Sequence, residues 1–170
     1  IGAGIIPAGM EMMDRPAIHA AEDFVHAGYP RDATAILLCE LDGTPDEVDT
    51  QLGTVRDIFE LHGCVETRVS ATEEERLRFW MGRKAAFPAM GRIAPDYYCM
   101  DGTIPRRNLG VVLQRIAELS EQYGLPVANV FHAGDGNLHP LIAYDANDDG
   151  QLEAAERLGG EILELCVEVG

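Results

Sequence analysis

The decapeptide FHAGDGNLHP, residues 131–140, lies between two apolar runs whose composition is typical of β-strands. Its Asp135-Gly136 pair predicts a β-hairpin turn, because glycine accepts a positive φ without steric cost. If His132 and His139 pair across this hairpin, their side chains lie on the same face of a sheet, with Cβ atoms roughly 5 Å apart. A one-residue shift of register would place the two imidazoles on opposite faces.

The two histidines allow three interpretations. In the first, they only bond backbone groups of a tight turn. In the second, they bind a metal ion such as zinc, which needs further ligands. Asp135 is the nearest candidate for a third ligand, although its carboxylate could equally accept from backbone N–H groups of the turn. In the third, one histidine acts as a general base beside a substrate.

Outward from the decapeptide, apolar runs predict strands, and helical spacing of apolar residues predicts helices. Strands are expected at residues 34–41, 65–69, 127–131 and 141–144, with 96–103 irregular or a short strand. Helices are expected at residues 17–26, 45–62, 73–87, 105–124 and 152–167, and the Met-rich residues 7–13 as one helical turn or more. Ser70 and Glu73 resemble a capping box at the start of the third of these helices.

This order of elements predicts an α+β fold. We expect a ferredoxin-like antiparallel sheet with a split βαβ core, covered on one face by helices and carrying a long helical insertion. A chain of 170 residues is long enough for one buried core and unlikely to form two full domains. The chain begins at Ile1 without an initiator methionine and ends within an amphipathic helix, so we expect residues 1–170 to be part of a longer protein.

Composition narrows the class of partner and the compartment. The net charge of −16 disfavours nucleic acid and anionic membranes, and no apolar run is long enough to span a bilayer. The four cysteines lack the short spacing of a zinc knuckle or a redox motif, which favours buried free thiols in a reducing compartment. The expected location is the cytoplasm, either free or peripheral to the inner face of the membrane.

Two further stretches are candidate sites. Arg83 lies within about one helical turn of Trp80 and Phe87, and an arginine beside aromatic rings can be packed and directed at a carboxylate. The alternative is a surface arginine whose stem covers core aromatic rings. Residues 145–156 match a calcium-binding loop in composition, but a strand rather than a helix is expected before them, which favours a solvated loop.

Three stretches together closely resemble the FAD-linked oxidase family, which includes the FAD-linked subunit of glycolate oxidase. They are residues 83–88, 95–106 and 131–140. The same superfamily, named after vanillyl-alcohol oxidase, contains D-lactate and D-2-hydroxyglutarate dehydrogenases. The resemblance extends over essentially the whole chain and implies the C-terminal cap, or substrate, domain of a flavoprotein whose FAD-binding domain lies outside residues 1–170.

The resemblance also implies roles for individual residues. His132 and His139 match the family's metal-binding histidines, and Arg83 matches the arginine that binds the substrate carboxylate. The family's remaining metal ligand, a glutamate, and a catalytic histidine next to it belong to a segment that follows the part matched here. Relatives that handle diacids carry an asparagine at the position of Leu141 and polar residues near the positions of Phe87 and Cys99, so a short monoacid is the expected substrate.

The resemblance therefore implies an FAD-dependent oxidoreductase that oxidises glycolate or D-lactate to the 2-oxo acid, together with other glycolate oxidase subunits. Its cofactors would be FAD and zinc or another divalent metal. Residues 1–170 alone are expected to be inactive. Two other classes stay open, namely a metal-dependent hydrolase built on the two histidines and a ferredoxin-like binding module without catalysis.

Overall fold

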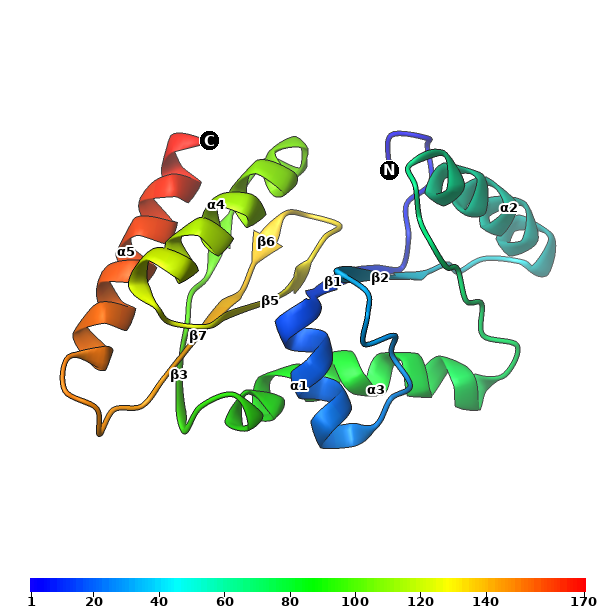
Figure 1. Ribbon diagram of the computed structural model, residues 1–170. Helices are drawn as coiled ribbons and strands as arrows, with labels where there is room; N and C mark the ends of the chain where they lie inside the picture. The colour runs from blue at the N-terminus through cyan, green and yellow to red at the C-terminus, as the bar shows by residue number, and fades with distance from the viewer.

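The computed structural model describes all residues from 1 to 170 (Figure 1). The strands are β1 (Gly9–Asp14), β2 (Ala35–Glu40), β3 (Asp96–Cys99), β4 (Gly102–Thr103), β5 (Val127–His132), β6 (Asn137–Leu138) and β7 (Pro140–Tyr144). The helices are α1 (Arg15–Val25), α2 (Pro45–Leu61), α3 (Glu73–Ala89), α4 (Leu109–Tyr123) and α5 (Gln151–Glu168). Two short 3-10 turns, η1 (Met90–Arg92) and η2 (Arg106–Asn108), follow α3 and precede α4.

The strands form one antiparallel sheet of seven strands, so the predicted α+β class is confirmed. The strand β5 lies between β1 and β7, β2 lies beyond β1, and β3 lies beyond β7. Because β3 and β5 are both antiparallel to β7, they are parallel to each other, and α4 connects them. This is the split βαβ unit that the order of elements predicted.

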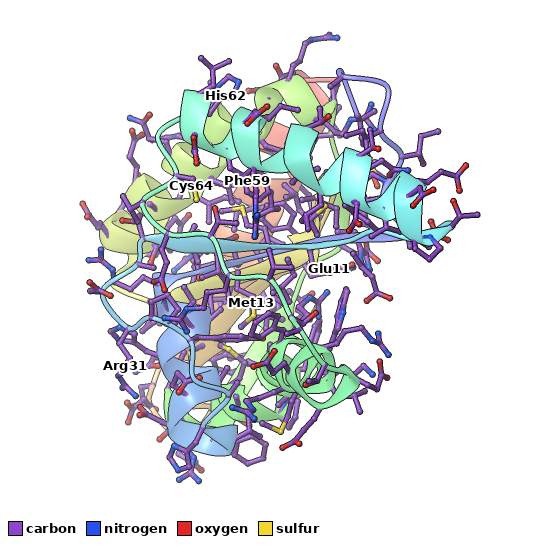
Figure 2. The ribbon with its side chains drawn as sticks, turned by 90° about the vertical axis from the view of Figure 1, so that its right-hand side faces the viewer. Glu11, Met13, Arg31, Phe59, His62 and Cys64 are labelled. Carbon is purple, nitrogen blue, oxygen red and sulfur yellow. The ribbon has the colours of Figure 1, made fainter.

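Helices cover both faces of the sheet, so the expectation of a single covered face was wrong. Along β5, Val127 and Phe131 pack with α4 and α5, whereas Ala128 and Val130 pack with α1 and α3. The two helical layers lie on opposite sides of the sheet in Figure 1, and Figure 2 shows α2 on the opposite side from α1 and α3. A strand that is buried on both faces reads as a mainly apolar run, and residues 127–131 do so with Asn129 as their one polar residue.

Two local predictions are corrected by long-range pairing. Residues 7–13 contain the strand β1 rather than a helical turn, because β1 is paired along one edge with β2 and along the other with β5. Residues 65–69 form no strand although their residues alternate, and Val65 is 95% exposed because no neighbouring strand covers it. Alternation alone therefore does not create a strand.

The start of α3 also differs from the prediction. Thr72, rather than Ser70, caps the helix and accepts a hydrogen bond from the Glu75 backbone N–H at 3.2 Å. Glu75 accepts in turn from the Ala71 backbone N–H at 2.7 Å. The helix is therefore capped two residues further along the chain than predicted, and because Glu75 bonds Ala71 and not Thr72, the reciprocal pair of a capping box does not form.

Tyr29 fixes the middle of α3. Its hydroxyl accepts from the Arg83 backbone N–H at 3.0 Å and donates to the Phe79 carbonyl oxygen, two groups that bond each other in a regular helix. Burial raises the pKa of Tyr29 to about 12, which keeps the hydroxyl protonated. The ring packs over Gly82, where an added Cβ would collide with it. Tyr29 therefore positions the turn of α3 that carries Arg83.

Replacing Gly82 by alanine should destabilise the domain by about 1–3 kcal/mol, because the buried Tyr29 ring would have to shift. The measurement is the free energy of unfolding in urea. Gly160→Ala in α5 is the matched control, because an added Cβ there meets nothing within 4 Å. The control should be neutral or stabilising by up to about 1 kcal/mol. Equal effects of the two substitutions would contradict the role of Tyr29.

Asp14 joins β1 and α1 to the central strand. One carboxylate oxygen accepts from the Ala17 backbone N–H at 3.1 Å, and the other accepts from the backbone and side-chain nitrogens of Asn129 at 2.9 and 2.7 Å. Burial disfavours the carboxylate more than these donors stabilise it, and it raises the pKa of Asp14 to about 6 from 3.8.

The raised pKa predicts how stability depends on pH. Below pH 3.8 Asp14 is protonated in the folded and the unfolded chain, so its full contribution is present. As the pH rises to about 6, the unfolded chain releases the proton first, and the contribution falls by up to roughly 3 kcal/mol. The measurement is the free energy of unfolding in urea for the wild type and Asp14→Asn between pH 3.8 and about 6. As the pH rises, the wild type should lose stability relative to the variant. A difference independent of pH would refute the prediction.

Candidate functional site

The candidate site lies on the sheet face covered by α3. Arg83 comes from α3, Glu11 from β1, His132 from the end of β5, and His139 from the residue between β6 and β7. Figure 2 labels Glu11 and Met13, which alternation along β1 places on the same face. The structure therefore brings together the three residues that the sequence predicted, and adds Glu11.

The two imidazoles are neighbours but not direct partners across the hairpin. His132 pairs with Asn137, and β6 and β7 continue in the same register against β5, with His139 between them. His139 is therefore a diagonal neighbour of His132 on the same face. The ring centroids are 5.2 Å apart and the ring planes lie at 86°. The two histidines share a face as expected, but they do not pair directly, because the turn is centred between Gly134 and Asp135 and not between Asp135 and Gly136.

The turn between the histidines is held by its own backbone and by the neighbouring β4 segment. Gly136 has a φ of +83°, and a Cβ there would collide with the Ile104 carbonyl oxygen. The Ile104 backbone N–H donates to the Gly136 carbonyl at 3.0 Å. The Asp135 carboxylate accepts from the Asn137 backbone N–H at 3.0 Å. Of the two interpretations of Asp135, the structure supports the turn rather than a metal ligand.

Glu11 contacts both Arg83 and His132. Its Oε2 lies 3.0 Å from Nε and 2.9 Å from Nη2 of Arg83, and its Oε1 lies 2.7 Å from Nδ1 of His132. The side chains of Glu11 and Arg83 are each 12% exposed. Sequence reasoning missed Glu11 because residues 7–13 were interpreted as helical. The available signal was an acidic residue on the same strand face as the core residue Met13.

His139 is the more buried of the two histidines, with a side chain that is 15% exposed. Burial of the ring lowers the pKa of His139, the nearby Asp101 carboxylate opposes this, and the charges on His132 and Arg83 lower it further. The ring is therefore neutral at pH 7 and carries one nitrogen lone pair. Phe87 of α3 packs edge-on against it, with ring centroids 6.2 Å apart.

Residues 1–170 do not assemble a complete metal site. No group of three or more histidine, cysteine, aspartate or glutamate side chains is placed to hold one ion. His132 still has the arrangement of a metal-ligating imidazole, because its Nδ1 is bonded to a carboxylate and its Nε2 is free of protein partners. The two imidazoles fit as part of a ligand set, and a metal held by these residues alone is not supported.

The remaining positions that the sequence singled out are Leu141, Cys99 and the candidate calcium loop, and they differ in burial. Leu141 is completely buried in the core beneath α1 and α3, and its strand partner Cys99 is exposed. In the proposed calcium loop, the Asp145 carboxylate accepts from the backbone and side-chain nitrogens of Asn147 at 2.8 and 2.9 Å. A strand, β7, precedes that loop, which supports the interpretation as a solvated turn.

Comparison with known proteins gives a consistent result. The family of FAD linked oxidases, C-terminal domain, matches residues 1–170. The chain is 65% identical over its whole length to glycolate oxidase subunit GlcD of Escherichia coli, and covers 34% of that protein. It is 32% identical to GlcD of Bacillus subtilis, with all of this chain and 36% of that protein covered. A probable mitochondrial D-lactate dehydrogenase of Danio rerio is 29% identical, with 96% of this chain and 34% of that protein covered.

A solved structure shares the fold. It is 4-ethylphenol oxidase from Gulosibacter chungangensis, with a TM-score of 0.61 and 13% identity over 99% of this chain and 39% of that chain. The chain thus spans about a third of the length of the curated relatives that it matches. None of its helices has both the length and the apolar character needed to cross a bilayer. The match over all 170 residues shows that the chain belongs to the family of FAD-linked oxidases, as their C-terminal domain.

Proposed function

We propose that residues 1–170 are the substrate domain of an FAD-dependent oxidoreductase that oxidises a short 2-hydroxy acid, glycolate or D-lactate, to the 2-oxo acid. The observation that carries this proposal is a cluster on one sheet face, in which two imidazoles lie near a guanidinium that is paired with Glu11 on one edge only. Relatives named as glycolate oxidase subunits and D-lactate dehydrogenases support it. FAD bound by the rest of the protein would supply the acceptor for the substrate's hydride.

Arg83 is suited to bind the substrate carboxylate. Its Nε and Nη2 contact Glu11, and its Nη1 makes no hydrogen bond within the chain. The end of the guanidinium can therefore form a bidentate pair with a carboxylate. The low exposure of the Arg83 side chain strengthens that attraction by reducing screening by water.

The histidines are suited to the other end of the substrate. A divalent metal such as zinc, held by His132 and His139 with the glutamate that the family resemblance assigns to a segment outside residues 1–170, would supply a Lewis acid for the substrate oxygens. Because His139 is neutral at pH 7, its lone pair is available to a ligand or to a hydroxyl proton. Phe87 limits the access of water on that side of His139.

The charges of the site favour a monoacid. The formal charges of Arg83 and Glu11 cancel each other. A second carboxylate on the substrate would therefore be desolvated without a partner among these residues. The buried Leu141 offers no polar group to such a carboxylate.

The proposal also covers the partner subunits and the cellular compartment of the protein. The description of two relatives as subunits supports the presence of further glycolate oxidase subunits. The four cysteines are free thiols, which supports a reducing compartment such as the cytoplasm, although the expectation that they are buried was wrong for the exposed Cys64 and Cys99. Membership of a flavoprotein family gives no support to a metal-dependent hydrolase or to a binding module without catalysis.

Anaerobic flavin reduction in the full-length protein tests the proposed function. Glycolate and D-lactate should bleach the flavin at least about 10-fold more efficiently than D-2-hydroxyglutarate, and Arg83→Lys should lower kcat/KM by about 10–100-fold, because lysine cannot form the bidentate pair. Arg78→Lys is the control, since Arg78 lies on the same helix with half of its side chain exposed. No bleaching by either monoacid would refute the proposal.

Zinc titration tests the histidine pair. In the full-length protein, His132→Ala and His139→Ala should each weaken zinc binding at least about 10-fold, because each removes one ligand. His62→Ala, an exposed histidine after α2, should bind as the wild type does. Wild-type affinity in both site variants would exclude a shared metal. Binding by the full-length protein but not by residues 1–170 would locate a further ligand outside them.

A further inference from the structure

Glu11 occupies a central place in the site without an assigned role. Its side chain hydrogen-bonds the side chains of both Arg83 and His132, and 72 and 121 residues of sequence separate it from them. Its backbone is held on both edges, because β1 pairs with β2 and with β5. The register with β5 places Glu11 directly opposite His132. The carboxylate is therefore fixed by the sheet and not by a flexible loop.

The contact with Arg83 determines which edge of the guanidinium is available. A guanidinium has two edges that can form bidentate pairs, one with Nε and one Nη, the other with both Nη atoms. Glu11 Oε2 occupies the first edge, at 3.0 Å from Nε and 2.9 Å from Nη2. The second edge, which includes Nη1, remains for a carboxylate of the substrate.

The contact with His132 determines where the imidazole proton resides. A carboxylate can only accept a hydrogen bond, so Nδ1 at 2.7 Å from Glu11 Oε1 must be the donor. When the ring is neutral, Nε2 then carries the lone pair. Only this tautomer leaves Nε2 able to bind a metal ion or accept a proton.

We propose that Glu11 is a positioning residue that orients the substrate arginine and fixes the tautomer of His132 with one carboxylate. The inference rests on the proposed function and extends it to a residue outside the predicted site. If Glu11 only stabilised the fold through a buried ion pair, its contact with Arg83 would be sufficient. The second contact, to His132, gives Glu11 a consequence for the chemistry at Nε2.

The substitution Glu11→Gln separates the two roles. The guanidinium donates and cannot accept, so the glutamine oxygen must face Arg83 and its NH₂ group must face His132. The NH₂ group donates to Nδ1, and the imidazole proton moves to Nε2. The fold can keep the side chain in place, while the lone pair at Nε2 is lost.

The experiment is long-range ¹H–¹⁵N NMR of the full-length flavoprotein labelled with ¹⁵N at histidine, with zinc titration of the same samples. In the wild type without metal, Nε2 of His132 should be the unprotonated nitrogen, and in Glu11→Gln it should be Nδ1. Zinc affinity should fall by about 10–100-fold. An unchanged tautomer with unchanged zinc affinity in Glu11→Gln would overturn the inference.

Two further variants keep the test decisive. Glu40→Gln is the matched control. Glu40 on β2 pairs at 3.2 Å with Arg76, which lies on α3 as Arg83 does, and it has no hydrogen bond to a histidine. It should leave the tautomer of His132 unchanged, and a change there would overturn the inference. If Glu11→Gln does not fold, Glu11→Asp is the second variant, because it keeps a carboxylate that can only accept hydrogen bonds. It should retain the wild-type tautomer of His132 and raise the KM for glycolate at least about 10-fold. The tautomer is measured without substrate, so failure of the inference is distinguishable from failure of flavin reduction by glycolate.

Discussion

The burial of β5 on both faces is the constraint on which the rest of the fold depends. Its residues from Val127 to Phe131 are all buried, and the alternate side chains pack against two different layers of helices. A strand in this position requires neighbours on both edges, and β1 and β7 supply them. The cluster of Glu11, Arg83, His132 and His139 lies at the end of β5, on the sheet face that α3 covers.

That cluster shows how a mainly apolar interior can hold charged groups. Glu11 and Arg83 are each 12% exposed, and each offsets the charge of the other. Tyr29 bridges the backbone of α3 at the turn that carries Arg83, so the position of the guanidinium depends on the loop after α1. The placement of Arg83 therefore depends on a contact that lies outside the site.

Fold and chemistry separate clearly in the comparisons. 4-Ethylphenol oxidase shares the architecture at 13% identity, which identifies a common arrangement of sheet and helices and nothing of the substrate. The relatives at 65% and 32% identity share the domain over its whole length. Recognition of the proposed 2-hydroxy acid would consequently depend on specific side chains, namely Arg83 and the two histidines, and not on the sheet that supports them.

The sequence by itself determined the helices, the hairpin around Asp135 and Gly136, and the family, whereas the register that places both histidines on one face came from the structure. These features depend on local periodicity or on short motifs, which are legible in a single chain. The tertiary structure alone decided that residues 9–14 form a strand, that residues 65–69 do not, and that Glu11 meets Arg83 and His132. The physical reason is that strand identity and contacts across 72 or 121 residues depend on which distant segments become neighbours, and periodicity does not encode that choice.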